Sequence, residues 1–188
     1  MELPHLDLPI RTQRLLLRDF AAPDWEAVHA YASRDDVCRF MPWGPNDEDA
    51  SRAYIGRALD EQSQTPRETY QLAVIETASD RLVGGVGLYI KSWQNRDGFI
   101  GYCFHSNVWG QGYATEAAGA LVDAGFSQLD LHRIWSTCDD ENLASARVME
   151  KLGWQQEGLL RQDVNLRGQW RDSRLLAILR PEWEARQG

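Results

Sequence analysis

A glycine-punctuated turn near the middle of the chain carries residues that could hold a phosphate. It reads Trp-Gly-Gln-Gly-Tyr-Ala-Thr-Glu-Ala at 109–117, after an apolar stretch and before a run with helical spacing. Gly110 and Gly112 lack a Cβ, so the backbone can adopt positive φ and turn successive N–H groups toward one point. A helix that begins there adds unpaired first-turn N–H groups and the positive end of its dipole. We therefore predict that this turn binds a phosphate or pyrophosphate.

Two common phosphate-binding motifs do not fit this turn. A Walker loop ends in Gly-Lys-Ser/Thr, and no lysine lies near the turn. A dinucleotide fingerprint needs a third glycine, where this chain has Thr115, and it occurs in the first βα unit rather than past mid-chain. A second glycine-rich run, at 84–87, alternates with aliphatic residues, which predicts a strand whose glycines serve close packing.

Length, charge and cysteine content narrow the functional class. The chain has 188 residues and a formal net charge of −8, so we predict one domain over residues 1–188. The acidic balance argues against nucleic acid as a partner and suits a cationic amine. The cysteines are odd in number, widely spaced and without a CxxC pair, which predicts buried free thiols in a reducing cytosol and no metal site: Cys38, Cys103 and Cys138.

The chain also lacks the signals of membrane insertion and export. No apolar run approaches the roughly 18 residues that a membrane helix needs. The first residues, Met-Glu-Leu-Pro-His at 1–5, have neither the basic nor the apolar part of a signal peptide. We expect a cytoplasmic protein without a membrane partner.

Apolar periodicity predicts alternating strands and helices. We predict strands at 14–20, 70–76, 82–91, 98–105, 133–138, 154–165 and 174–179, and those at 70–76 and 82–91 alternate as a hairpin. Helical spacing marks helices at 24–32, 46–61, 113–129 and 142–152. Hairpins in the first half and a strand–helix–strand crossover in the second imply an α/β (α+β) fold, a mixed sheet with helices on both faces.

A series of sequence blocks, in order along nearly the whole chain, resembles the GNAT N-acetyltransferases and within them the RimJ/RimL-like branch. Residues 12–18 and the loop at 41–43, Met-Pro-Trp, resemble that branch's opening strand and acceptor-side loop. Residues 100–105 and the glycine turn resemble its central strand and pyrophosphate loop. The blocks at 131–134, 140–145, 151–154 and 157–158 complete the pattern. In one departure, Asn107 stands where the wider superfamily has Gln or Arg, three residues before the first loop glycine.

The resemblance implies a cofactor and a way to bind it. It implies a GNAT-like, mostly antiparallel sheet of about seven strands whose central pair splays apart to admit the pantetheine arm of acetyl-CoA. Backbone groups of Tyr102, Cys103 and Phe104 would bind that arm, and the Phe104 N–H would stabilise the charge that develops on the acetyl oxygen. The pyrophosphate would lie on the turn residues Trp109, Gly110, Gln111, Gly112, Tyr113, Ala114 and Thr115. No metal is implied.

Asn142 and Ser145 lie three residues apart, on one face at the start of a predicted helix. From the residues alone, Asn-x-x-Ser is a common pattern at the N-terminal cap of a helix. The resemblance implies a second role, in which Asn142 bonds the coenzyme arm and Ser145 donates a proton to the departing thiolate. Many family members use a tyrosine for that step, and no tyrosine follows Tyr113 in this chain.

The residues do not select the base that the acceptor amine needs. At pH 7 a lysine-like amine costs about 4.6 kcal/mol to deprotonate, whereas an α-amine costs about 1 kcal/mol. A modest base, or a water chain ending at a carboxylate, therefore suffices for an α-amine. Candidates near strand ends are His105, Glu76, Asp97 and Asp139. Candidates for an aromatic acceptor wall are Trp43, Tyr54 and Trp93.

The resemblance leads us to expect acetyl transfer from acetyl-CoA to a primary amine. We expect direct attack in a ternary complex, because no cysteine has the positioned histidine that covalent transfer needs. The expected acceptor is a protein N-terminus, ribosomal or otherwise. A small amine such as an antibiotic, polyamine or amino acid is an alternative, and so is a non-catalytic acyl-CoA sensor. The protein is expected to be a monomer or homodimer.

Overall fold

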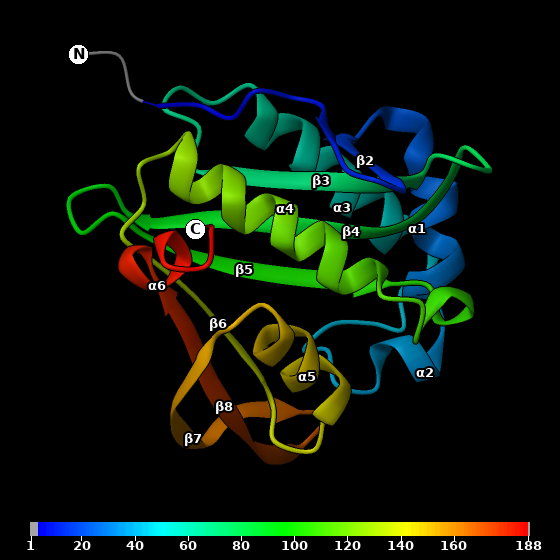
Figure 1. Cartoon of the computed structure of the whole chain (residues 1–188). Helices are drawn as coiled ribbons and strands as arrows, with labels where there is room; N and C mark the ends of the chain where they lie inside the picture. Colours follow the sequence, from blue (N-terminus) through cyan, green and yellow to red (C-terminus); the bar gives the residue numbers. More distant parts are fainter. Residues whose placement is uncertain (1–3, 188) are drawn as a thin grey trace.

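The computed structural model describes residues 4–187 and shows a mixed sheet with helices against both of its faces (Figure 1). Residues 1–3 and 188 lie outside the described part. Residues 1–3 belong to the stretch from which we expected no signal peptide. The strands follow the order β1-β2-β3-β4-β5-β6-β8-β7 across the sheet. The β5–β6 pair is parallel and every other neighbouring pair is antiparallel.

The described elements match the expected ones closely. The strands are β1 (Ile10–Arg11), β2 (Leu15–Asp19), β3 (Thr69–Glu76), β4 (Arg81–Ser92), β5 (Asp97–Phe104), β6 (Arg133–Asp139), β7 (Gln155–Leu166) and β8 (Gln169–Leu179). The helices are α1 (Trp25–Ala32), α2 (Asp35–Cys38), α3 (Glu48–Gln62), α4 (Tyr113–Ser127), α5 (Leu143–Lys151) and α6 (Arg180–Glu184), with 3-10 turns η1 (Ala22–Asp24) and η2 (Ser106–Val108).

The differences lie in short elements and in one strand end. The described sheet has eight strands, where we expected about seven, because the two-residue strand β1 adds an edge. α2 and α6 span four and five residues, too few for a helical period to show in the sequence. β8 begins at Gln169, five residues before the expected start at 174, because the polar residues there pair with β7 in an exposed hairpin.

The central strand pair separates, as expected. β5 and β6 are in register only from Asp97–Phe99 against Arg133–Trp135. Beyond that point β5 stays paired with β4 as far as Phe104, and β6 stays paired with β8 as far as Asp139. The carboxyl ends of β5 and β6 therefore diverge and leave part of the backbone of both strands unpaired.

Two apolar clusters fill the two faces of the sheet. Successive strand residues point to opposite faces, so Ile100 of β5 packs with Leu121 and Phe126 of α4. Cys103, also in β5 but on the other face, packs with the cluster that contains Tyr31 of α1 and Ile55 of α3. Figure 1 shows α4 across one face and α1 and α3 behind the other. The splayed strand ends thus lie between two helical layers.

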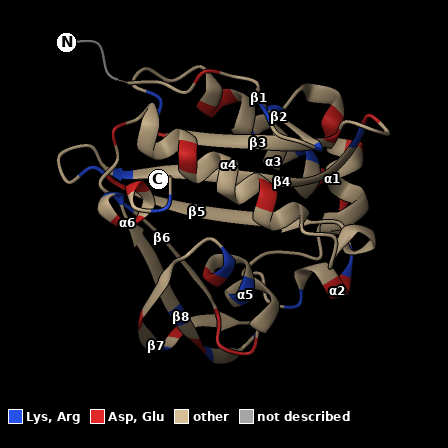
Figure 2. Cartoon of the chain, viewed as in Figure 1, with Lys and Arg blue, Asp and Glu red and all other residues tan. Residues whose placement is uncertain are grey.

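The surface charge is distributed rather than concentrated. Acidic and basic residues alternate over helices and strands (Figure 2), and several form ion pairs, such as Arg133 Nη2 with Glu157 Oε2 at 2.6 Å. Among residues 4–187, no helix is long and apolar enough to cross a membrane. In the same residues, no three His, Cys, Asp or Glu side chains gather as metal ligands.

Candidate active site

The glycine turn presents a row of unpaired backbone donors. Gly110 and Gly112 have φ of +76° and +83°, and Gly112 is the residue that precedes α4. The six N–H groups from Gly110 to Thr115 donate to no residue in the described part of the chain. A Cβ on Gly110 would meet open space within 4 Å. Unpaired donors, a helix N-terminus and open space together fit a phosphate group.

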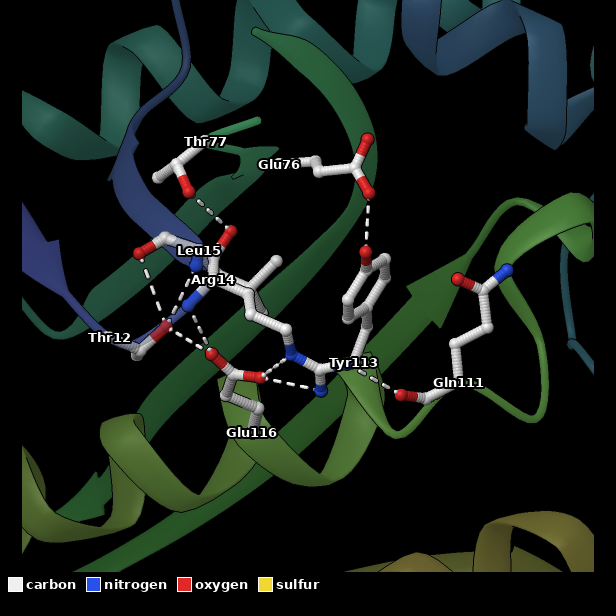
Figure 3. A network of polar contacts seen from close by, with 8 residues as sticks. All are labelled: Thr12, Arg14, Leu15, Glu76, Thr77, Gln111, Tyr113 and Glu116. Atoms are coloured by element: carbon white, nitrogen blue, oxygen red, sulfur yellow. Dashed lines mark hydrogen bonds and ion pairs between the residues drawn. The ribbon is translucent and has the colours of Figure 1, made fainter. Parts of the chain in front are cut away.

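A partly buried carboxylate fastens this turn to the segment between β1 and β2 (Figure 3). Glu116 Oε1 accepts hydrogen bonds from Thr12 Oγ1 at 2.6 Å and from Arg14 N at 2.8 Å, and Oε2 accepts from Arg14 Nε at 2.7 Å. Arg14 Nη1 also donates to Gln111 O at 2.9 Å. Burial acts to raise the pKa of Glu116, but these hydrogen bonds outweigh it and the pKa is lowered. Glu116 is thus a fixed anion that orients the turn.

A second contact holds the turn to the end of β3. The Tyr113 hydroxyl donates to the Glu76 carboxylate at the end of β3 (Figure 3). The Arg14 guanidinium lies over the Tyr113 ring, 4.5 Å from its centroid. The hydrogen bonds from Ser79 and Tyr113 lower the pKa of Glu76. Glu76 therefore holds the turn and lies apart from the central cavity.

The backbone N–H of Phe104 faces the gap between β5 and β6. Phe104 is paired with Gly84 in β4, and the next residue, His105, donates its N–H to Val83 O at 2.9 Å. Hydrogen-bonded and non-bonded pairs alternate in an antiparallel ladder, so the Phe104 N–H points away from β4. Its carbonyl accepts a hydrogen bond from Trp109 Nε1 at 2.9 Å. The N–H is oriented as a donor to an acetyl oxygen would be.

A cavity of about 620 Å³ begins at this gap and extends over the α1–α3 face of the sheet. Of the expected cofactor residues, Tyr102, Cys103, Asn142 and Ser145 line it. Phe104 and the turn residues 109–115 do not line it. The structure thus places the expected phosphate contacts outside the cavity and the expected thioester contacts, except Phe104, within it.

Ser145 hydrogen-bonds a tyrosine that the sequence analysis considered only for its backbone. The Tyr102 hydroxyl lies 2.9 Å from Ser145 Oγ and 3.0 Å from Ser145 O. Burial raises the pKa of Tyr102 well above its ordinary value, so the phenol stays protonated. Asn142 Oδ1 accepts from Ser145 N at 3.2 Å and caps α5. No linear motif links residues 102 and 145, which meet only because β5 and β6 splay.

One candidate base lines the cavity, and it is already an ion-pair partner. Asp139 Oδ2 accepts from Arg171 Nε, and Oδ1 accepts from Arg171 Nη2, both at 2.9 Å. The hydrogen bonds from Arg171 lower the pKa of Asp139. A carboxylate held in this way is a weak proton acceptor at neutral pH.

The other three candidate bases lie outside the cavity lining. His105 Nδ1 accepts from Asn107 N at 3.1 Å, and burial lowers the pKa of His105. Glu76 accepts the hydrogen bond from the Tyr113 hydroxyl, as described above. Asp97 lies at the start of β5, where it accepts from Trp135 Nε1 at 3.2 Å. That end of β5 is the one that remains paired with β6.

The aromatic wall contains two of its three expected members. Trp43, 38% exposed, and Tyr54 line the cavity. Trp93 does not, because it packs against the apolar cluster on the α4 side. Tyr89 and Phe99 complete the wall, with ring centroids 5.9 Å apart. We did not expect these two, because their spacing in the sequence is that of ordinary strand residues.

The floor of the cavity is glycine backbone. Gly85 and Gly87 of β4 and Gly101 of β5 line it, and Gly87 is paired with Gly101. A Cβ on Gly87 would come within 2.8 Å of the Tyr89 hydroxyl. We interpreted the run at 84–87 as close packing. The alternate glycines, with Gly101 opposite, also make room for the cavity.

The cysteines have the character of thiols rather than thiolates. Cys103 and Cys138 line the cavity, and burial raises their pKa to about 12 and about 11. Cys38 is fully buried and its pKa is also raised by burial. Cys103 is partly exposed rather than buried as expected. Thiols of such high pKa are poor nucleophiles at neutral pH.

Comparison with known proteins assigns this geometry to a family. Residues 14–155 match the acetyltransferase (GNAT) domain. The chain is similar to the uncharacterized N-acetyltransferase YnaD of Bacillus subtilis (strain 168), with 35% identity over 93% of this chain and 98% of that protein. A solved GNAT-family acetyltransferase from Bacillus anthracis, 35% identical, superposes with a TM-score of 0.83 over 93% of this chain and 100% of that one.

A more distant structure was solved with coenzyme A. It is spermidine N-acetyltransferase from Vibrio cholerae in complex with CoA and spermine, 19% identical, with a TM-score of 0.79 over 92% of this chain and 99% of that one. At this identity the likeness is one of fold. The family match, the unpaired donors of the turn and the splayed strands agree: the chain belongs to the GNAT acetyltransferases and uses acetyl-CoA as its co-substrate.

Proposed function

We propose that the protein acetylates the α-amine of a protein N-terminus, as a RimJ/RimL-like member of its family. The observation that carries this proposal is the absence of a strong base from the cavity lining in the described residues. Asp139 is the one carboxylate there, and the hydrogen bonds from Arg171 lower its pKa. An α-amine has a pKa of about 8 and needs little help to become neutral at pH 7, whereas a lysine-like amine needs a strong base.

The residues around the gap have separate roles in this proposal. The turn N–H groups bind the pyrophosphate of acetyl-CoA, and the Phe104 N–H stabilises the acetyl oxygen as the amine nitrogen attacks. The new C–N bond forms, the C–S bond breaks and the amine proton leaves to water. Ser145 Oγ donates a hydrogen bond to the departing sulfur. Full proton transfer is not required, because a thiol of pKa about 8.5 leaves readily as thiolate.

Tyr102 determines where the Ser145 proton points. The phenol has one hydrogen and two neighbouring acceptors, Ser145 O and Ser145 Oγ. When Tyr102 donates to the carbonyl, the Ser145 hydroxyl can donate to Tyr102 and is turned away from the cavity. When Tyr102 donates to Oγ, the Ser145 hydrogen is released to face the sulfur. We assign the second arrangement to turnover.

A thiol-release assay with acetyl-CoA tests the acceptor class. The panel pairs lysine-free peptides bearing a free α-amine with N-formylated peptides bearing one lysine, and adds spermidine and single amino acids. We expect release with the free α-amine peptides and at least about tenfold less with the lysine peptides. Faster release with the lysine peptides would refute the α-amine assignment. No release with any amine would favour an acyl-CoA sensor.

One observation favours a small amine as the second candidate. The cavity wall is aromatic, with Trp43, Tyr54, Tyr89 and Phe99, and its volume is that of a small-molecule pocket. A compact amine with an apolar body would fit this wall. The same panel decides the question, because such an acceptor would show a lower KM as a free amino acid or small amine than as a peptide.

A further inference from the structure

An arginine from the β7–β8 hairpin reaches across the rim of the cavity. Arg167 occupies the hairpin turn with Gly168, at φ of +50° and +86°. Its Nη2 donates to Cys38 O at 2.9 Å, to Gly44 O at 2.9 Å and to Trp43 O at 3.4 Å. The side chain thus joins the hairpin to a loop that lies more than 120 residues earlier in the sequence.

The two segments that Arg167 joins both form walls of the same cavity. The loop between α2 and α3 contributes Met41, Pro42 and Trp43 to the lining, and β7 contributes Val164 and Leu166. No residue of the phosphate-binding turn lies among these walls. This side of the cavity is therefore the one left for the acceptor once the turn has bound the coenzyme.

The loop has little other support for its backbone. Met41 N donates to Cys38 O at 3.0 Å, and Asn46 N donates to Ala32 O at 2.9 Å, so both of its ends are tied. Between them, Pro42 and Pro45 have no N–H to donate. Within residues 4–187, the carbonyls of Trp43 and Gly44 accept hydrogen bonds from Arg167 alone.

We propose that Arg167 is a positioning residue for the acceptor, which holds the Trp43 wall against the β7–β8 hairpin. This inference rests on the proposed function, because it takes this side of the cavity as the acceptor site. The hydrogen bonds fix the loop before the acceptor binds. The entropy cost of ordering the loop therefore does not reduce the binding free energy of the acceptor. Loss of Arg167 therefore weakens acceptor binding and leaves acetyl-CoA binding unchanged.

The geometry of the Arg167 hydrogen bonds suggests two variants that separate loss of the donors from loss of the side-chain stem. All three bonds come from Nη2, which has only two hydrogens. The longest bond, to Trp43 O, must therefore share a hydrogen with one of the other two. A lysine ammonium carries three hydrogens on one nitrogen. Arg167→Lys, although about one bond shorter, keeps the charge and a donor for each carbonyl, whereas Arg167→Met keeps the apolar stem and loses every donor. Arg161, exposed on β7 and without a hydrogen bond or ion pair to the described residues, provides the control Arg161→Met.

Hydrogen exchange tests the contact without reference to activity. We expect a peptide covering residues 39–46 to exchange about tenfold faster in Arg167→Met than in the wild type, which corresponds to a loss of about 1.4 kcal/mol. Arg167→Lys and Arg161→Met should exchange within about twofold of the wild type. Equal exchange in Arg167→Met and Arg161→Met would overturn the proposal, whether or not any amine is turned over.

Steady-state kinetics tests the consequence for the acceptor. With the best amine of the panel, Arg167→Met should raise the acceptor KM about tenfold and leave the KM for acetyl-CoA within about twofold. Arg167→Lys should restore the acceptor KM. Equal increases in both KM values would show a general loss of structure and overturn the acceptor-specific role. Absence of turnover in the wild type would instead refute the proposed function.

Discussion

The two ends of the proposed site, the phosphate-binding turn and the cavity, are built in different ways. At the donor end, one run of residues at 109–117 supplies both the turn and the first turn of α4. At the acceptor end, the walls come from α1 and α3, the loop between α2 and α3, the strands β4 and β5, and the strands of the β7–β8 hairpin. The donor end is therefore local in sequence, whereas the acceptor end exists only after the sheet has formed.

The two ends also differ in the groups they present. The donor end presents backbone N–H groups, which any residue has, so its chief requirement is the positive φ of Gly110 and Gly112. The acceptor end presents side chains whose identity decides what fits. Members of one family can thus share the donor end while their acceptor ends diverge.

The largest expected effect comes from straining the backbone at one end and then at the other. Gly112→Val places a β-branched residue at φ +83° and should abolish coenzyme A binding. The thermal stabilisation by the coenzyme, about 2.7 kcal/mol at a hundredfold excess over Kd, should disappear. Calorimetry and thermal melts measure both quantities.

Gly168→Val is the matched control at the acceptor end. Gly168 has φ +86°, and a Cβ there meets no atom within 4 Å. The backbone strain is similar, but we expect coenzyme A binding to persist and the acceptor KM to rise, because the turn that carries Arg167 is disturbed. Retained coenzyme binding in a folded Gly112→Val protein would refute the pyrophosphate assignment.

The next largest effect lies where the two ends meet. Ser145→Ala should reduce kcat tenfold to a thousandfold, nearer about tenfold because the thiolate is a good leaving group, and more at low pH than at high pH. Tyr102→Phe should reduce kcat about three- to tenfold and leave the KM for acetyl-CoA unchanged. In the Ser145→Ala background, Tyr102→Phe should have no further effect on kcat.

Additive losses in that double-mutant cycle would show that Tyr102 does not act through Ser145. A Ser145→Ala enzyme with a lower melting temperature and full turnover would leave Ser145 as a helix-start residue alone. Its cost would then be about 1 kcal/mol of stability.

The contrast between the two ends also explains what the sequence could predict. The turn at 109–117 was recognisable because glycine, helix start and preceding strand are contiguous, and the phosphate binding that we propose for it depends on local backbone geometry. Six of the seven longer strands, β2–β6 and β8, were recognisable because their apolar residues face the two buried clusters. β7 contributes to neither cluster and was recognised from the Arg167-Gly168 turn that follows it. The splay was expected from family resemblance, and the early end of β5–β6 pairing confirms it.

The remaining features depend on tertiary contacts that have no linear signal. Arg167 reads as a turn residue beside Gly168, and its contact with Gly44 appears only when the hairpin folds over the loop. Trp93 and Trp43 look alike in the sequence, yet one packs against the core and the other lines the cavity. Composition identifies candidate aromatic residues, whereas topology decides which of them meet.

A smaller effect separates the acceptor classes by pH. The pKa values of Asp139 and His105 are lowered, so above pH 7 Asp139 is already ionised and His105 is largely neutral. The pH dependence of kcat/KM should then follow the acceptor. For an α-amine we expect a rise of about tenfold per pH unit that levels off near pH 8, whereas a lysine-like amine would continue to rise toward about pH 10.4. A profile flat from pH 6.5 to 9 would contradict both.

The smallest expected effect is that of thiol alkylation, which probes all parts of the cavity at once. Cys38 lies beside the acceptor loop, where its Sγ donates to Ala32 O at 3.1 Å, while Cys103 and Cys138 lie near the gap. Burial raises the pKa of each thiol, that of Cys103 to about 12. At pH 8 a thiol with a pKa this far above the ordinary value is almost entirely protonated, whereas roughly a quarter of an ordinary thiol is a thiolate. Iodoacetamide under native conditions should therefore leave turnover within about twofold of the untreated enzyme, as followed by intact mass and thiol release.

Rapid modification of Cys38 with loss of acceptor binding would show that the acceptor end opens in solution. In that case Arg167→Met should accelerate the reaction and Arg161→Met should not.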